Sequence, residues 1–105
     1  MGPLEVDPGD RQPISGSASR AAPNPFREST TVRYSTRQQG RVRIVVHDMS
    51  GSRIRVLADG LLEPGFHSTT WDGTDNAGKT CSSGVYWVRM YFPGGAETKT
   101  VVLIR

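Results

Sequence analysis

The sequence predicts an all-β fold, an antiparallel β-sandwich of about seven short strands. Three observations predict it. Apolar and polar residues alternate along several short stretches, which is the pattern of half-buried strands. The 105 residues include 12 glycines and 7 prolines, so turn signals separate these stretches throughout. No stretch of about ten or more residues keeps the helical spacing of apolar side chains.

A change in composition divides the chain into an N-terminal arm, residues 1–22, and one domain, residues 23–105. The arm has three prolines, three glycines and a Ser/Ala-rich stretch, a composition that buries too little apolar area to offset its ordering entropy. We expect a flexible tether or, alternatively, a strand that pairs with the sheet edge of a neighbouring molecule. No apolar run is long enough to cross a membrane, and residues 1–5 lack the features of a signal peptide.

The domain is expected to open with a rigid turn, Pro23-Asn24-Pro25-Phe26, that offers Phe26 to the core. Alternating strands are predicted at Thr30–Ser35, Arg41–Asp48 and Arg53–Leu57, the last two joined by a hairpin turn. Their expected inward side chains are Val32, Tyr34, Val42, Ile44, Val46, Ile54 and Val56.

In the second half, Leu61 and Leu62 are expected to close one end of the core within the connection between Asp59 and Gly65. A polar loop is predicted over residues 72–78. The remaining predicted strands are Phe66–Trp71, Lys79–Ser82, Val85–Phe92 and Thr98–Ile104.

Six stretches of the domain carry a family resemblance. They are Pro23-Asn24-Pro25-Phe26, Thr31-Val32-Arg33-Tyr34, Val42-x-Ile44-x-Val46-x-Asp48-x-x-Gly51-x-x-Ile54, Gly65-x-His67-x-x-x-Trp71-Asp72-Gly73-x-Asp75-x-x-Gly78, Ser83-Gly84-Val85-Tyr86 and Lys99-x-Val101-Val102-Leu103-Ile104-Arg105. Together they resemble the immunoglobulin-like domain of flagellar-hook-capping (FlgD-like) proteins. They are also similar to the C-terminal sorting domains of type IX secretion. The resemblance covers residues 21–105 and implies an immunoglobulin-like β-sandwich.

The resemblance implies a non-catalytic C-terminal module of an exported bacterial protein, secreted or at the cell surface, that acts in sorting or attachment. Its expected partners are proteins: secretion machinery, the parent protein or like subunits. Two alternatives stay open. One is a self-associating structural or adhesive subunit that uses its arm for strand complementation, and the other is a scaffold domain of flagellar hook assembly.

The matched residues also have physical roles of their own. Trp71 and Tyr86 are large side chains on different strands and are expected to bridge the two sheets, with Phe26 and Tyr34 as further core anchors. The glycines expected to supply turn conformations that other residues reach only at a cost are Gly73, Gly78 and Gly84.

The supply of reactive groups is thin. The chain has two histidines, His47 and His67, and one cysteine, Cys81, with no metal-ligand spacing, nucleophile elbow or phosphate-binding glycine loop. His67 shares a strand face with Trp71, so a structural role is expected, and His47 is expected to be exposed. We therefore expect no enzyme and no cofactor.

The loop over residues 72–78 is the one candidate for a metal. Asp72, Asp75 and Asn76 offer oxygen ligands of the kind that Ca²⁺ prefers. However, the EF-hand pattern fails, because the twelfth position from Asp72 is Ser83 rather than glutamate. A turn-rich hairpin explains the same residues without an ion, and we favour it.

Basic residues concentrate in one part of the chain. The net charge is +3, and between Arg27 and Arg55 seven arginines face only two acidic residues. A surface of Arg33, Arg41, Arg43, Arg53 and Arg55 would attract an acidic partner, although a solvated sheet face is the favoured interpretation. Because exposed aromatic residues do not interleave with these arginines in sequence, and no recognition helix is present, nucleic-acid binding is not expected.

Overall fold

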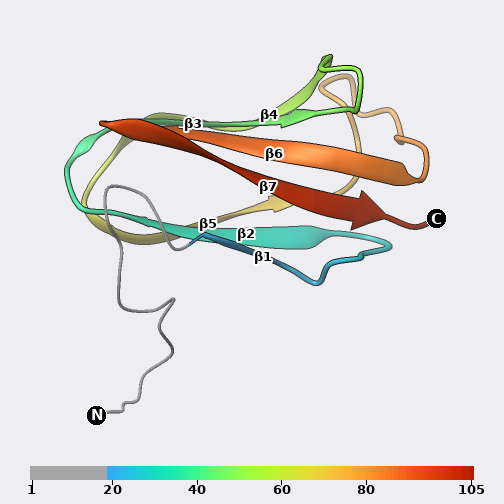
Figure 1. The fold of residues 1–105 in the computed structure, drawn as a ribbon, viewed down its shortest axis with the longest axis horizontal. Coiled ribbons are helices and arrows are strands. Elements are labelled where there is room, and N and C mark those ends of the chain that lie inside the picture. The colour runs from blue at the N-terminus through green and yellow to red at the C-terminus, as the bar shows by residue number, and fades with distance from the viewer. Residues whose placement is uncertain (1–18) are drawn as a thin grey trace, which may run out of the picture.

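The computed structural model describes residues 19–105, and in that part of the chain every regular element is a β-strand. Two antiparallel sheets pack face to face (Figure 1), with strand orders β1-β2-β5 and β4-β3-β6-β7. The predicted immunoglobulin-like β-sandwich of about seven strands is therefore confirmed. The strands are β1 (Arg20–Ala22), β2 (Thr30–Thr36), β3 (Gly40–His47), β4 (Arg53–Leu62), β5 (Gly65–Trp71), β6 (Gly84–Phe92) and β7 (Gly95–Leu103).

The sandwich begins inside the segment that was predicted to be arm. Strand β1 pairs with β2, with Arg20 opposite Arg33 and Ala22 opposite Thr31, and Ala21 packs against the core. Ser19 is buried as well, and its hydroxyl donates to Glu97 Oε2 at 2.8 Å. The boundary at residue 23 is thus too late. Residues 1–18, and with them the predictions for the arm, lie outside the described residues.

The core lies between the sheets and is built around an aromatic cluster. Trp71 is fully buried, and its ring meets those of Phe26 and Tyr86 edge to face, with centroids 5.5 and 5.0 Å apart. Tyr34 packs further along, 6.1 Å from the ring of Phe92. The four aromatic residues predicted as core anchors therefore lie in the core. Aliphatic side chains complete it: Val32, Val42, Ile44, Val46, Val88, Met90, Val101 and Leu103.

Two irregularities in the pairing of β3 with β4 change which side chains face inward. The register shifts between Ile44 and Val45 and again between Val46 and His47, so β4 carries two extra residues. Each β-bulge interrupts the alternation of the strand that contains it. As a result Val56 lies opposite Val45, outside the core cluster, whereas Leu57 and Ala58 pack against that cluster. The predicted inward orientation of Val56 is wrong for this reason.

Strand β4 is also longer than predicted, because it continues through Asp59 and Gly60 to Leu62. Leu62 packs against the core, but Leu61 points outward and is 75% exposed, so only one of the two leucines closes the core. The predicted strand at Lys79–Ser82 is absent; there Thr80 forms a single bridge to Thr74. The predicted number of strands is right, because the unpredicted strand β1 takes the place of the predicted strand at residues 79–82.

The segment before β2 covers part of the edge of β7. Phe26 lies parallel to Leu103, donating its N–H to the Val102 carbonyl at 2.9 Å and accepting from the Ile104 N–H at 2.8 Å. The Asn24 amide adds two bonds, donating to Thr100 O and accepting from the Val102 N–H. We call residues 24–26 the β7 clasp. It satisfies backbone groups that an edge strand would otherwise leave unpaired.

Replacing Gly40 with alanine is expected to lower the free energy of unfolding by about 1–3 kcal/mol, the usual cost of overpacking. A Cβ at Gly40 would overlap the ring of Pro93 in the β6–β7 turn, and a proline ring has little freedom to move aside. Urea unfolding followed by circular dichroism measures the change. Gly60→Ala is the matched control, since nothing lies within 4 Å of a Cβ there. Equal stability of the two variants would contradict the expectation.

Candidate functional site

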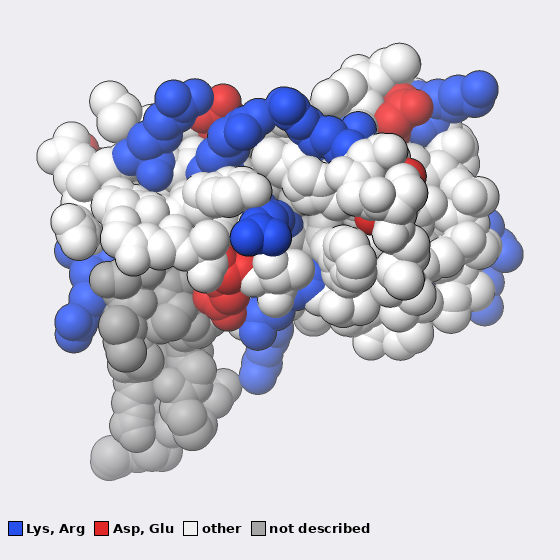
Figure 2. Space-filling view, turned by 45° about the horizontal axis from the view of Figure 1, so that its top comes forward, with Lys and Arg blue, Asp and Glu red and all other residues white. Residues whose placement is uncertain are grey.

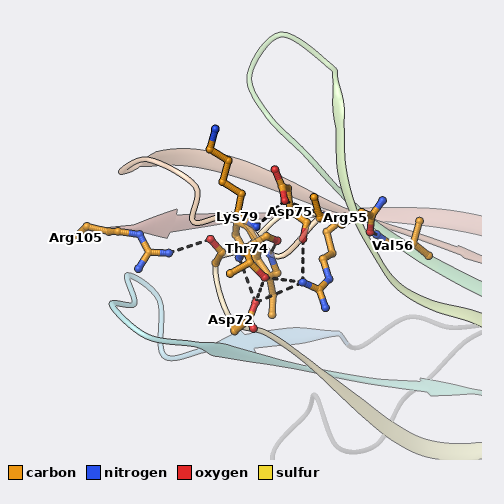
Figure 3. A network of polar contacts seen from close by, with 11 residues as sticks. Arg55, Val56, Asp72, Thr74, Asp75, Lys79 and Arg105 are labelled. Atoms are coloured by element: carbon orange, nitrogen blue, oxygen red, sulfur yellow. Dashed lines mark hydrogen bonds and ion pairs between the residues drawn. The ribbon is translucent and has the colours of Figure 1, made fainter.

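The loop between β5 and β6 folds over one end of the sandwich and bonds mainly to itself (Figure 3). Asp72 Oδ1 accepts the Thr74 N–H at 3.2 Å and the Thr74 hydroxyl at 2.5 Å. Asp75 Oδ1 accepts the N–H groups of Ala77 and Lys79 at 3.0 and 2.9 Å. Both carboxylates thus act as turn-forming acceptors, which is the usual role of aspartate in tight loops.

Two arginines fasten this loop to the rest of the domain. Arg55 of β4 donates to Thr74 Oγ1 and to the Asp75 carbonyl, and its Nη1 lies 3.8 Å from Asp72 Oδ1. From the other side, Arg105 donates to the carbonyls of Gly73 and Cys81, and Figure 3 draws one contact of its guanidinium with the loop. Charge-assisted hydrogen bonds from Arg55, before the loop in sequence, and from Arg105, after it, therefore hold the loop in place.

Asn76 completes the loop by pairing with the edge of β4. Its N–H donates to the Ile54 carbonyl at 3.0 Å, and its Oδ1 accepts the Val56 N–H at 3.1 Å. The side chain thus stands in for a neighbouring strand. Asp72 and Asp75 accept bonds from within the loop, whereas Asn76 accepts from β4. Residues 19–105 contain no group of three or more His, Cys, Asp or Glu suited to hold a metal ion.

Two of the three glycines predicted to supply special turn conformations do so. Gly73 and Gly78 have φ angles of 78° and 84°, in the left-handed region. Gly73 is also crowded, since a Cβ there would come within 2.6 Å of Arg105 Nη2. Gly84 differs: it is the first residue of β6, without a positive φ and without a close neighbour. The predicted role of Gly84 as a turn glycine is wrong.

Calcium is expected to leave the melting temperature of the domain unchanged. The Oδ1 atoms of Asp72, Asp75 and Asn76 already accept N–H or O–H donors, so an ion that used these oxygens would compete with those bonds. Thermal unfolding in excess calcium and in excess chelator measures this, with Asp75→Asn as the matched variant. A rise in melting temperature with calcium that Asp75→Asn abolishes would instead establish the calcium site that Asp72, Asp75 and Asn76 suggested.

Acid is expected to destabilise the domain through its turn aspartates. The Ser50 hydroxyl lowers the pKa of Asp48, and the Thr74 hydroxyl, with a smaller contribution from the Arg55 charge, lowers the pKa of Asp72. Because the folded pKa lies below the unfolded one, the stabilisation is complete above the ordinary aspartate pKa of about 3.9 and is lost as pH falls through the folded value. Unfolding curves between neutral and acidic pH should show this loss. Asp48→Asn with Asp72→Asn should flatten the acidic limb; an unchanged slope would contradict the assignment.

The five arginines predicted to form one surface are divided among three places. Arg33 lies exposed on the outer face of the three-stranded sheet, on the opposite side of the sandwich from β3 and β4. Arg55 is turned towards the loop, because the bulge beside it places it opposite the inward-facing Val46. Arg41, Arg43 and Arg53 remain together on the outer face of the four-stranded sheet. Arg33 and Arg55 therefore do not share a face with the other three arginines, and the acidic-partner face stays a prediction for Arg41, Arg43 and Arg53.

Aromatic residues do interleave with arginines on that face, contrary to the prediction. Strand β6 lies beside β3, with Trp87 opposite His47, Arg89 opposite Val45 and Tyr91 opposite Arg43. The predicted arginine surface lies within residues 33–55, whereas Trp87, Arg89 and Tyr91 alternate in β6, far along the chain. Their outward alternation with Val88 and Met90, both fully buried, is the signal that would have found them.

The histidines and the cysteine serve the scaffold. His47 Nδ1 lies 3.2 Å from the Gly51 carbonyl, and His67 Nε2 lies 2.7 Å from the Glu63 carbonyl, so each imidazole bonds to backbone. Burial raises the pKa of the Cys81 thiol, and the Asp75 charge adds to the rise, which lowers the fraction of reactive thiolate. Residues 19–105 also contain no helix with the length and apolarity needed to span a membrane.

Comparison with known proteins identifies the same fold elsewhere. The sequence profile described as FlgD Ig-like domain matches residues 26–95. Among solved structures, dimeric latent PorU from Porphyromonas gingivalis matches 82% of the chain with a TM-score of 0.67 and 22% identity. PorZ from the same organism, described as an essential bacterial surface component of the type IX secretion system, matches 83% with a TM-score of 0.56 and 24% identity. FlgD from Xanthomonas campestris, described in connection with hook capping essential for flagellar assembly, matches 84% with a TM-score of 0.57 and 21% identity.

The chain spans only part of each of these proteins: 9% of PorU, 11% of PorZ and 63% of the Xanthomonas FlgD chain. A search of curated protein sequences finds no match. At these identities the likeness establishes a shared fold, and function has to be inferred from the site.

Proposed function

Because the chain belongs to the FlgD Ig-like domain family, we propose that it is a non-catalytic C-terminal module of an exported bacterial protein and acts in sorting or cell-surface attachment. The observation that carries the proposal is the occurrence of this fold as a small part, 9% and 11%, of PorU and PorZ. A domain that recurs as a minor part of larger proteins, one of them a surface component of a secretion system, suits a module that positions its parent protein.

The arrangement of polar groups supports a non-catalytic role. The carboxylates of the loop act as turn acceptors, both imidazoles bond to backbone carbonyls, and the thiol is shielded. A nucleophile needs an adjacent base and an oriented third group, and these residues are each engaged elsewhere. Such a module would act by binding another protein, in the secreted or surface-exposed state of its parent.

A reporter fusion tests the proposal. The full chain is placed after a periplasmic reporter protein in a bacterium that carries a type IX secretion system, and the reporter is assayed at the cell surface and in the medium. We expect surface-attached or released reporter, and none when the same fusion is made in a strain that lacks the system. A reporter that stays in the periplasm of the secreting strain would refute the sorting function.

Flagellar hook assembly is the second candidate, favoured by the match to 63% of the Xanthomonas FlgD chain. The same fusion separates the two functions. A hook scaffold domain would reach the exterior through the flagellar export apparatus, so loss of that apparatus, and not of the type IX system, would retain the reporter inside the cell.

Self-association through the arm is a separate proposal, supported by the description of PorU as dimeric. Because β1 starts at Arg20, deleting residues 1–18 leaves β1 to β7 in place. The mass in solution of the full chain and of the deletion should differ if the arm joins neighbouring molecules. Two monomers would refute arm-mediated association.

A further inference from the structure

The outer face of the four-stranded sheet carries a cluster that the proposed function leaves unexplained. Pairing of β3 with β6 brings together five side chains on the solvent side: Arg43, His47, Trp87, Arg89 and Tyr91. We call them the aromatic–arginine face. Trp87, Arg89 and Tyr91 follow one another at every second residue of β6, so adjacent members are about 7 Å apart along the strand.

A hollow of about 230 Å³ lies in this face, between His47 at one end and Tyr91 at the other, with Trp87 and Arg89 in its wall. The guanidinium of Arg89 lies over the Tyr91 ring, 5.6 Å from its centroid. Thr98 of β7 adds a hydroxyl to the rim. The hollow is large enough for one or two side chains of a partner and combines apolar walls with hydrogen-bond donors.

The charge of this side of the molecule is positive. Arg41 and Arg43 share one carboxylate, Asp59, at 2.8 and 3.7 Å. Within residues 19–105, Arg53 and Arg89 have no carboxylate at ion-pair distance. Figure 2, which turns the upper side of Figure 1 forward, shows blue Lys and Arg side chains along this side with few red carboxylates between them. Such a surface attracts an acidic partner.

Two buried nitrogens of the same face lack hydrogen bonds within the described part of the chain: Arg43 Nε and His47 Nε2. A buried polar atom without a partner costs about 1–3 kcal/mol. A carboxylate oxygen brought by a partner, with a small rotation of the covering side chains, would supply an acceptor to the Arg43 guanidinium. The unsatisfied Arg43 nitrogen therefore indicates the same ligand chemistry as the charge.

From these observations we propose that the aromatic–arginine face docks an acidic polypeptide segment, with carboxylates on Arg89 and Arg43 and an apolar side chain in the hollow beside Trp87. This rests on the proposed function, since a sorting or attachment module needs a partner protein to hold. Trp, Tyr and Arg are the residue types that dominate protein-binding hot spots. A nucleic-acid strand fits less well, because Trp87 is partly buried and Arg89 already covers the Tyr91 ring on which a base would stack.

The test measures binding of a fluorescein-labelled oligoglutamate peptide to the full chain by fluorescence anisotropy at low salt. Arg89→Ala should weaken binding about tenfold or more, the usual effect of losing a charge-assisted hydrogen bond. Tyr91→Ala should weaken it less. Arg33→Ala is the matched control, because it removes an equally exposed arginine from the opposite sheet, and it should leave the affinity unchanged. Circular dichroism confirms that each variant is folded, and Arg89→Lys should restore part of the affinity.

Three results would overturn the proposal: no binding of oligoglutamate by the wild-type chain, equal losses for Arg33→Ala and Arg89→Ala, or tighter binding of an oligothymidine strand or of alginate that Arg89→Ala also weakens. The last result would assign the face to a nucleic acid or to an acidic glycan. The reporter assay is read separately. If the chain binds oligoglutamate through Arg89 but does not export the reporter, the sorting function is refuted and the docking surface stands. If the Arg89→Ala fusion is exported and its peptide binding is unaltered, the docking surface is refuted and the sorting function stands.

Discussion

Replacing Trp71 with alanine is expected to lower the free energy of unfolding by about 3–5 kcal/mol, a large share of the roughly 5–15 kcal/mol that stabilises a typical domain. Trp71 is fully buried, its ring meets two others edge to face, and its indole N–H donates to the Thr74 carbonyl at 2.8 Å. The variant therefore loses core packing, aromatic contacts and one attachment of the β5–β6 loop. Thermal unfolding followed by far-ultraviolet circular dichroism should show a melting temperature lower by at least about 12 °C.

The second tryptophan provides the control. Trp87 lies on the outer sheet face and is only partly buried, so Trp87→Ala should cost less than Trp71→Ala. Trp71→Phe should fall between them, because it keeps a ring in the core but leaves the Thr74 carbonyl without its donor. If the two alanine variants unfold at the same temperature, Trp71 does not have the central role in the core that its burial indicates.

Replacing Phe26 with alanine is expected to cost a similar amount, about 3–5 kcal/mol. Only 2% of Phe26 is exposed, and its ring packs against Trp71. Its backbone N–H donates to the Val102 carbonyl, and its carbonyl accepts from the Ile104 N–H. Loss of the ring removes the part of the β7 clasp that is anchored in the core. Hydrogen exchange of the Ile104 amide, which donates to the Phe26 carbonyl, should accelerate along with the fall in stability.

Phe66 is the matched control for this variant. It is 73% exposed on β5, so Phe66→Ala should change the free energy of unfolding by no more than about 0.5 kcal/mol. Fast exchange at Ile104 in Phe66→Ala would show that the amide is not protected by the clasp. An unchanged exchange rate of the Ile104 amide in Phe26→Ala would also show that the clasp does not protect this amide.

The part of the fold that could be predicted from sequence is the part in which each strand has one buried and one solvated face. In β3, Val42, Ile44 and Val46 alternate with polar residues and are all buried as predicted. In β6, Tyr86 is buried as predicted. The turn at Asp48 also forms as predicted, with Oδ1 accepting two backbone N–H groups. Local chemistry determines these features, so a single sequence is enough to find them.

The errors occur where distant residues decide the structure. Strand β1 consists of Arg20, Ala21 and Ala22, which carry no alternation and become a strand because β2 offers an edge. The bulges of β4 depend on its pairing with β3, and they separate Arg53 from Arg55, which a regular strand would place on one face. The candidate site was missed in part for the same reason, since pairing across 48 residues of sequence joins Arg43 to Tyr91.

The parallel arrangement of Phe26 and Leu103 has a mechanical consequence. Where tension is applied through the sequence before residue 20 and beyond residue 104, the hydrogen bonds between Phe26 and its two partners are loaded together in shear, and they do not open one after another as they would in a zipper. Survival under tension depends on the rate of unfolding more than on its equilibrium. A surface anchor that must hold a load while its neighbours are pulled away would gain from this geometry.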